Sequence, residues 1–238
     1  MTAVEPSRFF AAMATVPDGV GGAERICQAC LRVLPFQRAA IAVNIEDTGW
    51  EVLCASDSVA ERIEGLQATV SAGPGIEAAI SGMPVFIDDF AVIHRRWPLL
   101  GAALGLSDRG AMYALPLQVG AARVGVLDLY RDEPGRLEPA ECAAASSVAR
   151  VVTMILLGDG RAEGNGSEVV LGSWWESAPR GQEIHQASGM VAVQLTVSVR
   201  HAYARLQAHA FAGDRTLADV AHDVVTRQLR FDPAAGEA

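Results

Sequence analysis

The chain has 238 residues, of which half are hydrophobic and 20% are charged, so it can bury a core and is not disordered by composition. All 19 residues in its lysine and arginine total are arginine, which excludes phosphate-binding loops, pyridoxal Schiff bases and other chemistry that needs a lysine. The formal charge of -9 disfavours non-specific attraction to DNA or to anionic membranes, because both need a positive field.

Targeting signals and cysteine content both favour a protein inside the cell. The longest nearly apolar run, residues 151–157, is far shorter than the roughly 18 residues that a membrane helix needs. The N-terminus has Glu5 and only Arg8 before its first aromatic pair, which is unlike a signal peptide. Four cysteines in a chain of this size fit a reducing compartment, where thiols pack as small hydrophobic groups. We therefore expect a cytoplasmic protein that does not span a membrane.

The first part of the chain mixes strand and helix patterns. Apolar residues alternate over residues 39–46 and again over 50–55, and the turn between them predicts a hairpin. The next expected elements, in chain order, are helices at 59–66 and 74–82, a short strand at 84–88, a loop containing His94, Arg95, Arg96 and Trp97, and a helix from 98 to 106.

Residues 111–118 and 122–130 predict a second hairpin, joined across Gly120. On its second strand, Leu127 and Leu129 share one face, and the other face carries Val124, Val126, Asp128 and Tyr130. Asp128 interrupts an apolar face, so its carboxylate needs either an arginine partner or a ligand cavity. A helix over 138–157 follows. These elements predict an α+β domain with an antiparallel sheet flanked by helices.

Residues 158–180 begin with four glycines in ten positions and predict a linker. Beyond it, the spacing of Ile184, Ala187, Val191 and Leu195 predicts one helix. Ser198 can cap a second helix, and a capping box at Thr216 opens a third. Three short helices bury little surface by themselves, so we expect the first to pack on another chain or on the larger domain.

The chain contains no metalloprotease or serine hydrolase motif, which disfavours an enzyme. Cys27-x-x-Cys30 has no second pair, and one helical turn with buried or half-buried thiols is the simplest interpretation. His201, His209 and His222 lie off the apolar stripes, as solvated histidines do, so we expect no metal site.

Residues 183–231 resemble the ANTAR domain, a three-helix RNA-binding module of transcription antiterminators. The specific part of the resemblance is Gln186-Ala187-Ser188-Gly189-Met190, followed by Ala202-Tyr203 and Val220-Ala221. Members of that family often have arginine where this chain has Gln207. The unit from residue 181 to residue 238 carries five arginines and six acids, a net charge of -1.

Residues from about 20 to 157 resemble a GAF domain, a sensory α+β fold. The matching segments are residues 76–85, Arg96-Trp97-Pro98, residues 114–117 and residues 124–130. The resulting organisation is an N-terminal segment at 1–19, a GAF-like domain at 20–157, a linker at 158–180 and an all-α ANTAR-like domain at 181–238. GAF followed by ANTAR is a pairing that occurs in high-GC actinobacteria, and the all-arginine basic set suits such a genome.

The combined resemblance implies a signal-responsive antiterminator that works as a homodimer and binds paired stem-loops in nascent RNA. Because arginine and aromatic side chains read single-stranded loops, the expected RNA-binding residues are Arg200, Tyr203, Arg205, Arg227 and Arg230. The candidate ligand-binding residues in a GAF pocket are Trp97, Tyr113 and Asp128.

Other functions stay open at this point. The cyclic-nucleotide signature of GAF domains needs a lysine, and no cysteine is placed for a bilin, so we expect no bound cofactor. A small-molecule pocket and a purely structural GAF domain remain equal alternatives. The chain could also be a protein-interaction module whose helices only pair chains, or a GAF-type thiol enzyme with a low-pKa cysteine.

Overall fold

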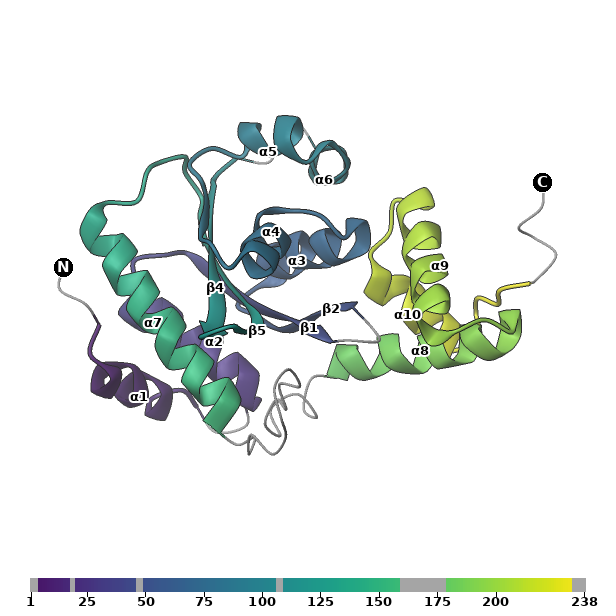
Figure 1. Ribbon diagram of the computed structural model, residues 1–238, viewed down its shortest axis with the longest axis horizontal. Coiled ribbons are helices and arrows are strands. Elements are labelled where there is room, and N and C mark those ends of the chain that lie inside the picture. Colours follow the sequence, from purple (N-terminus) through teal and green to yellow (C-terminus); the bar gives the residue numbers. More distant parts are fainter. Residues whose placement is uncertain (1–3, 18–19, 46–48, 106–108, 159–178, 233–238) are drawn as a thin grey trace.

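A computed structural model describes residues 4–17, 20–45, 49–105, 109–158 and 179–232. It contains a larger α+β part followed by a unit of three helices that lies beside it (Figure 1). The linker predicted at 158–180 lies almost entirely outside the described residues, as do the last six residues of the ANTAR-like domain.

A five-stranded antiparallel sheet forms the centre of the larger part, in the order β2-β1-β5-β4-β3. Both predicted hairpins are present in it. The strands are β1 (Arg38–Ile45), β2 (Gly49–Ala55), β3 (Val85–Ile87), β4 (Ala111–Val119) and β5 (Ala122–Arg131). Because β1 pairs with β5, two hairpins distant in sequence form one continuous sheet.

One side-chain position on β5 differs from the alternation that the sequence predicts. Gly125 lies opposite Leu117, and Arg123 lies opposite Gln118, so Val124 is an extra residue without a partner. Such a bulge reverses the side on which the following residues fall. Val124 therefore packs with Leu127 in the opposite core, and the prediction that it shares a face with Asp128 is wrong.

Helices cover both faces of the sheet (Figure 1). One face is covered by α1 (Pro6–Ala14), α2 (Gly22–Val33) and α7 (Pro139–Gly158). The other is covered by α3 (Ser58–Val70), α4 (Pro74–Ser81), α5 (Ala91–Arg96) and α6 (Pro98–Leu104). The sheet thus separates two hydrophobic cores.

Two regions are more helical than the sequence indicates. Helix α1 has no predicted counterpart, and of α2 the sequence predicts only the single turn at residues 27–30. Phe9 of α1 is fully buried in the core beside α7, so residues 1–19 include a structural part of the larger domain. The predicted loop at 94–97 is wrong up to Arg96, because α5 ends there. Asp89 Oδ1 accepts a hydrogen bond from the backbone N–H of Ala91 at 2.8 Å, and Ile93 is buried, which together stabilise this short helix.

Helix α7 is long and apolar enough on average to cross a membrane. It packs on the sheet, however, with Ala144, Val148 and Val152 fully buried. This burial is typical of a core helix in a globular domain, and the structure gives no support for a membrane protein.

The C-terminal unit consists of α8 (Pro179–Leu195), α9 (Val199–Ala212) and α10 (Leu217–Val225). Ser198 caps α9, and the predicted capping box at Thr216 is present. Helix α10 ends at Val225: the backbone leaves the helix at Thr226, and Arg227 has a φ of +62°.

The apolar stripe of α8 lies inside the three-helix unit. Ile184, Ala187 and Val191 are buried against α9 and α10, and Leu195 is half-buried. The interpretation of this stripe as a seam between two chains is therefore wrong for the folded unit. The unit nevertheless packs on the larger domain, as one of the two sequence-based alternatives requires, through contacts of α8 with β2 and of α9 and α10 with α3.

Candidate functional site

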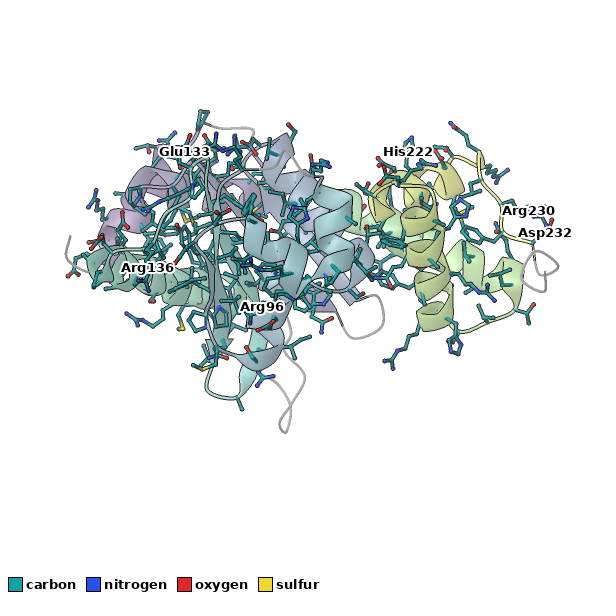
Figure 2. The ribbon with its side chains drawn as sticks, turned by 90° about the horizontal axis from the view of Figure 1, so that it is seen from above. Arg96, Glu133, Arg136, His222, Arg230 and Asp232 are labelled. Atoms are coloured by element: carbon teal, nitrogen blue, oxygen red, sulfur yellow. A yellow bond between two sulfur atoms is a disulfide. The ribbon has the colours of Figure 1, made fainter. Side chains whose placement is uncertain are left out.

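Four arginines of the C-terminal unit are exposed and unpaired. Arg200 and Arg205 lie on α9, and Arg227 and Arg230 follow α10. Within the described residues, none of these guanidinium groups has a carboxylate or carbonyl partner. In Figure 2, Arg230 is labelled at the outer end of the unit, away from the larger domain. These side chains are free to contact an anion such as a phosphate.

Most described arginines of the larger domain, in contrast, bind acceptors within it. Arg38 Nε lies 2.7 Å from Asp57 Oδ2, and Arg131 Nη2 lies 2.6 Å from Glu141 Oε1. The other arginines of this domain with an acceptor are Arg25, Arg32, Arg62, Arg96, Arg109, Arg123, Arg136 and Arg150. Arg8 and Arg95 are the exceptions among its described residues. The unpaired basic surface is therefore concentrated on the smaller unit.

Tyr203, the fifth predicted RNA-binding residue, is buried with 7% of its surface exposed. Its hydroxyl donates a hydrogen bond to the Trp50 carbonyl on β2 at 3.4 Å. Burial, and then the charge of Glu51, raise the pKa of Tyr203, so the hydroxyl stays protonated and can donate. In this arrangement its ring is not available to stack on a base, which differs from the role that the resemblance implies.

Gln207, the departure from the ANTAR pattern, also contacts the larger domain. Its Nε2 donates to the Ala68 carbonyl at 2.7 Å and to Ser71 Oγ at 2.8 Å, both at the C-terminal end of α3. Beside it, the backbone N–H of Leu217 donates to Thr69 Oγ1 at 3.1 Å. No sequence pattern identified these residues as an interface, because neither polar pair is close in sequence.

A cleft of about 930 Å³ remains between the two parts of the chain. Its lining comes from β2, the first half of α3, the start of α10 and part of α8, and includes the acidic residues Glu24, Asp57, Glu61, Glu183 and Asp219. Several of these carboxylates have other roles. Asp57 and Asp219 cap α3 and α10, and Glu183 lies 3.3 Å from His222 Nδ1.

The three residues proposed for a GAF ligand pocket do not lie together. Tyr113 points into the core beneath α2 and α7, where its hydroxyl donates to the Gly135 carbonyl at 2.5 Å. Asp128 and Trp97 lie on the opposite side of the sheet, where Trp97 packs into the core beneath α3 to α6. Tyr113 therefore does not share a face of the sheet with Asp128 and Trp97, because adjacent strand positions alternate in direction and Tyr113 pairs with Leu129 rather than Asp128.

Asp128 belongs to a buried polar cluster with Glu64, Gln67 and Tyr130. Tyr130 donates to Glu64 Oε1, and Gln67 Nε2 lies 3.2 Å from both Glu64 oxygens. Neither Asp128 oxygen has a hydrogen-bond partner of normal geometry among the described residues. The predicted arginine partner is therefore absent from that part of the chain.

Burial, and then the nearby Glu64 carboxylate, raise the pKa of Asp128 well above its ordinary value. Burial also raises the pKa of Glu64 to about 7, although the hydrogen bonds that Tyr130 and Gln67 donate to its carboxylate oppose this shift. A Cβ atom at Gly75 would lie 2.3 Å from Asp128 Oδ2, so only glycine allows this approach. The sequence pattern missed Glu64 and Gln67, which look like ordinary polar positions of a surface helix.

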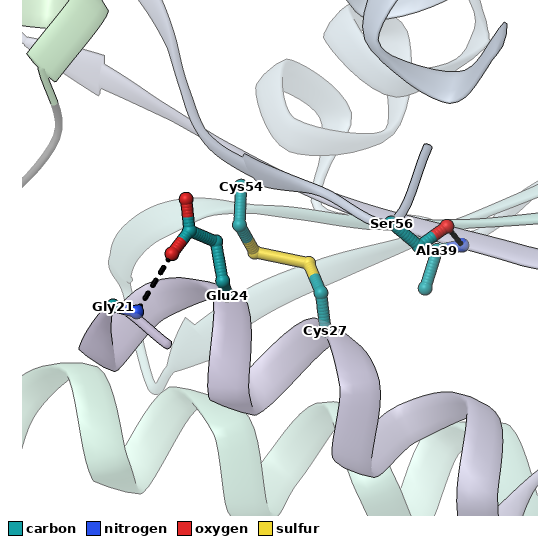
Figure 3. Close-up of a disulfide and its surroundings, with 6 residues drawn as sticks. All are labelled: Gly21, Glu24, Cys27, Ala39, Cys54 and Ser56. Carbon is teal, nitrogen blue, oxygen red and sulfur yellow. Dashed lines mark hydrogen bonds between the residues drawn. A yellow bond between two sulfur atoms is a disulfide. The ribbon is translucent and has the colours of Figure 1, made fainter. Parts of the chain in front are cut away.

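The cysteines differ from the sequence-based interpretation. Cys27 of α2 and Cys54 of β2 form a disulfide (Figure 3), which contradicts the expectation that all four thiols are reduced packing groups. Cys30 is a buried free thiol whose pKa burial raises to about 12. Burial and the charge of Glu141 raise the pKa of the Cys142 thiol. Neither free cysteine therefore has the depressed pKa that a thiol enzyme needs.

Residues 23–156 match the family described as GAF domain. No curated protein matches the chain. A similar solved structure is the domain of a putative two-component sensor histidine kinase protein from Sinorhizobium meliloti 1021. It is 19% identical with a TM-score of 0.43, and the match covers 56% of this chain and 85% of that one.

Another similar solved structure is the GAF domain from an Acinetobacter phosphoenolpyruvate-protein phosphotransferase. It is 9% identical with a TM-score of 0.49, and the match covers 70% of this chain and all of that one. The family match ends before the C-terminal unit, whose likeness to ANTAR remains the resemblance described from its sequence.

Proposed function

The chain belongs to the GAF domain family, and we propose that it is a signal-responsive RNA-binding regulator of transcription. In this proposal the GAF domain senses a signal or pairs two chains, and the C-terminal unit binds stem-loops in nascent RNA and thereby prevents termination. The protein works as a homodimer and performs no catalysis.

The observation that supports RNA binding is the distribution of unpaired arginines. Nucleic-acid affinity depends on basic groups that can reach phosphates, and arginines already bound to carboxylates contribute less. Of the five arginines in residues 181–238, four are exposed without a partner among the described residues, whereas Arg215 is paired with Asp223 at 2.7 Å. A unit that only pairs helices does not require such a set, and this feature favours RNA binding over a pure interaction module.

The proposal can be tested by filter binding of the full chain to an RNA with two short stem-loops, at several salt concentrations. We expect Arg205→Ala to weaken binding several-fold and to reduce the salt slope by about 0.7, the value for one contact to a single strand. Arg95→Ala is the matched control, because Arg95 is also exposed and unpaired but lies on α5 of the GAF domain.

Three results would change the assignment. If Arg205→Ala and Arg95→Ala weaken RNA binding equally, the C-terminal unit is not the part of the chain that contacts RNA. Equal binding of a matched DNA hairpin would favour a DNA-binding unit. Failure to bind either nucleic acid at low salt would leave the interaction module as the better function.

A further inference from the structure

At the contact between the GAF domain and the C-terminal unit, the C-terminal end of α3 and the N-terminal end of α10 each have a backbone group that bonds to the other part of the chain. The last carbonyls and the first N–H groups of a helix have no partner within that helix. Here the Ala68 carbonyl near the end of α3 receives the Gln207 amide, and the Leu217 N–H at the start of α10 reaches Thr69 Oγ1. Each unit therefore satisfies a backbone group that the other leaves open, which gives the contact a defined geometry.

The third part of the contact is formed by Tyr203 against β2. Gly49 has a φ of +77°, and a Cβ atom there would lie 2.9 Å from the Tyr203 ring. Glycine thus permits both the backbone conformation and the close approach of the ring. Along α9, Tyr203, Gln207 and Phe211 recur at spacings of four, so one side of this helix faces the GAF domain.

This contact competes with part of the proposed RNA surface. Arg200 precedes Tyr203 by three residues and Gln207 by seven, so it belongs to the same side of α9. A tyrosine packed under the Trp50 carbonyl cannot stack on a base at the same time. Arg205 lies five residues after Arg200 on another side of the helix and stays exposed. In the docked arrangement Tyr203 is therefore covered, whereas Arg200, which lies at the edge of the contact, and the other three arginines stay exposed.

The contact has the physical character of a reversible one. A cleft of about 930 Å³ opens beside the contact, so the facing surfaces are not completely buried against each other. The specific bonds of the contact are polar: the hydrogen bonds of Tyr203, Gln207 and Leu217, and an ion pair of His185 on α8 with the buried Glu51 on β2. Water can hydrate all of these groups when the surfaces separate. Polar contacts between domains of one chain are typically mobile.

From these observations we propose that docking of α9 and α10 on α3 and β2 is an autoinhibitory latch, which masks the Tyr203 side of α9 from RNA. The inference rests on the proposed RNA-binding function. It assigns Gln207 to the latch rather than to RNA. Any signal that the GAF domain senses acts by moving β2 or the end of α3 and so releasing the unit.

The test uses the full chain with the substitutions Gln207→Ala and Thr69→Val combined, which remove the bonds at both helix ends. Gly49→Ala is an independent second variant that presses on the Tyr203 ring from the other side. Gln186→Ala is the control, because Gln186 lies on α8 and its side chain is exposed. Amide hydrogen exchange over residues 49–52, 67–72 and 217 measures docking, and filter binding of the two-stem-loop RNA measures masking.

We expect both release variants to exchange faster at these amides and to bind the RNA about tenfold more tightly than the wild type, with the control unchanged. Unchanged exchange in both release variants would overturn the latch even if RNA binds. Faster exchange with unchanged RNA affinity would overturn masking. If no variant binds RNA at low salt although exchange accelerates, the proposed function fails and masking of RNA fails with it.

Discussion

The GAF domain and the C-terminal unit differ in whether their arginine side chains have partners. The domain binds most of its arginines internally and also buries two carboxyl groups, Glu64 and Asp128, which stay close together at the cost of raised pKa values. Among its described residues, the unit leaves four arginines unpaired at the surface, namely Arg200, Arg205, Arg227 and Arg230. A domain that satisfies its own charges is suited to a scaffold or sensor, and a unit that does not is suited to binding a charged partner.

The two parts also differ in how their cores are held. The GAF domain has a sheet with a core on each face and a disulfide from α2 to β2. The unit has one small core of three helices without a cross-link. Small cores have little stability to lose, so an equal perturbation should unfold the unit before the domain. The following predictions test this contrast.

The largest effect is expected from a charge in the core of the unit. Val191 is fully buried, and Val191→Glu should cost more than about 4 kcal/mol, because a carboxylate there is neither hydrated nor paired. Circular dichroism should show loss of helix, and hydrogen exchange should place the loss in α8 to α10. Val193→Glu is the control, because Val193 is 81% exposed on the same helix. If the Val191→Glu variant is folded and monomeric, the apolar stripe of α8 lies on the surface of the unit and not in its core.

Breaking the disulfide should have the next largest effect, confined to the other part. Cys27 and Cys54 are 27 residues apart, and loss of a cross-link over such a loop costs about 3–4 kcal/mol, mainly because the unfolded chain gains entropy. Urea unfolding of the wild type with and without dithiothreitol measures this loss. The double variant Cys27→Ala and Cys54→Ala should unfold at the reduced midpoint and should not respond to the reductant. A response in that variant would assign the effect to another thiol.

The buried carboxyl pair should make stability depend on pH. Raised folded-state pKa values favour folding while the groups are protonated, so the wild type should lose stability as pH rises from about 4.5 to above the pKa of about 7 of Glu64. Asp128→Asn removes one of the two groups that resist ionisation, and should be more stable than the wild type at pH 8 by about 2 kcal/mol. Its stability should also depend less on pH.

Thermal melts at pH 4 and pH 8 measure this difference. Asp214→Asn is the control, because Asp214 is exposed in the C-terminal unit. If the Asp128→Asn variant keeps the full pH dependence of the wild type, the effect arises elsewhere in the chain.

Local patterns predicted the elements more successfully than the contacts. Strand alternation predicted both hairpins, and capping signals located the starts of α9 and α10. Helix α1 and the short α5 escaped detection, and of α2 only the turn at residues 27–30 was predicted. The hydrophobic stripe of α8 was identified correctly, but its partner was not, because apolar spacing carries no information on what covers it.

The sequence by itself determined the two-part organisation, the GAF-like sheet and the arginine-rich composition, since these depend on periodicity, capping and residue type over short distances. Only the tertiary structure decided that Tyr113 and Asp128 lie on opposite faces, that Cys27 pairs with Cys54, and that Tyr203 and Gln207 bind the GAF domain. Each of these depends on strand register or on the packing of segments distant in the chain. A single sequence without homologues carries little information about such contacts, because many partners satisfy the same local pattern.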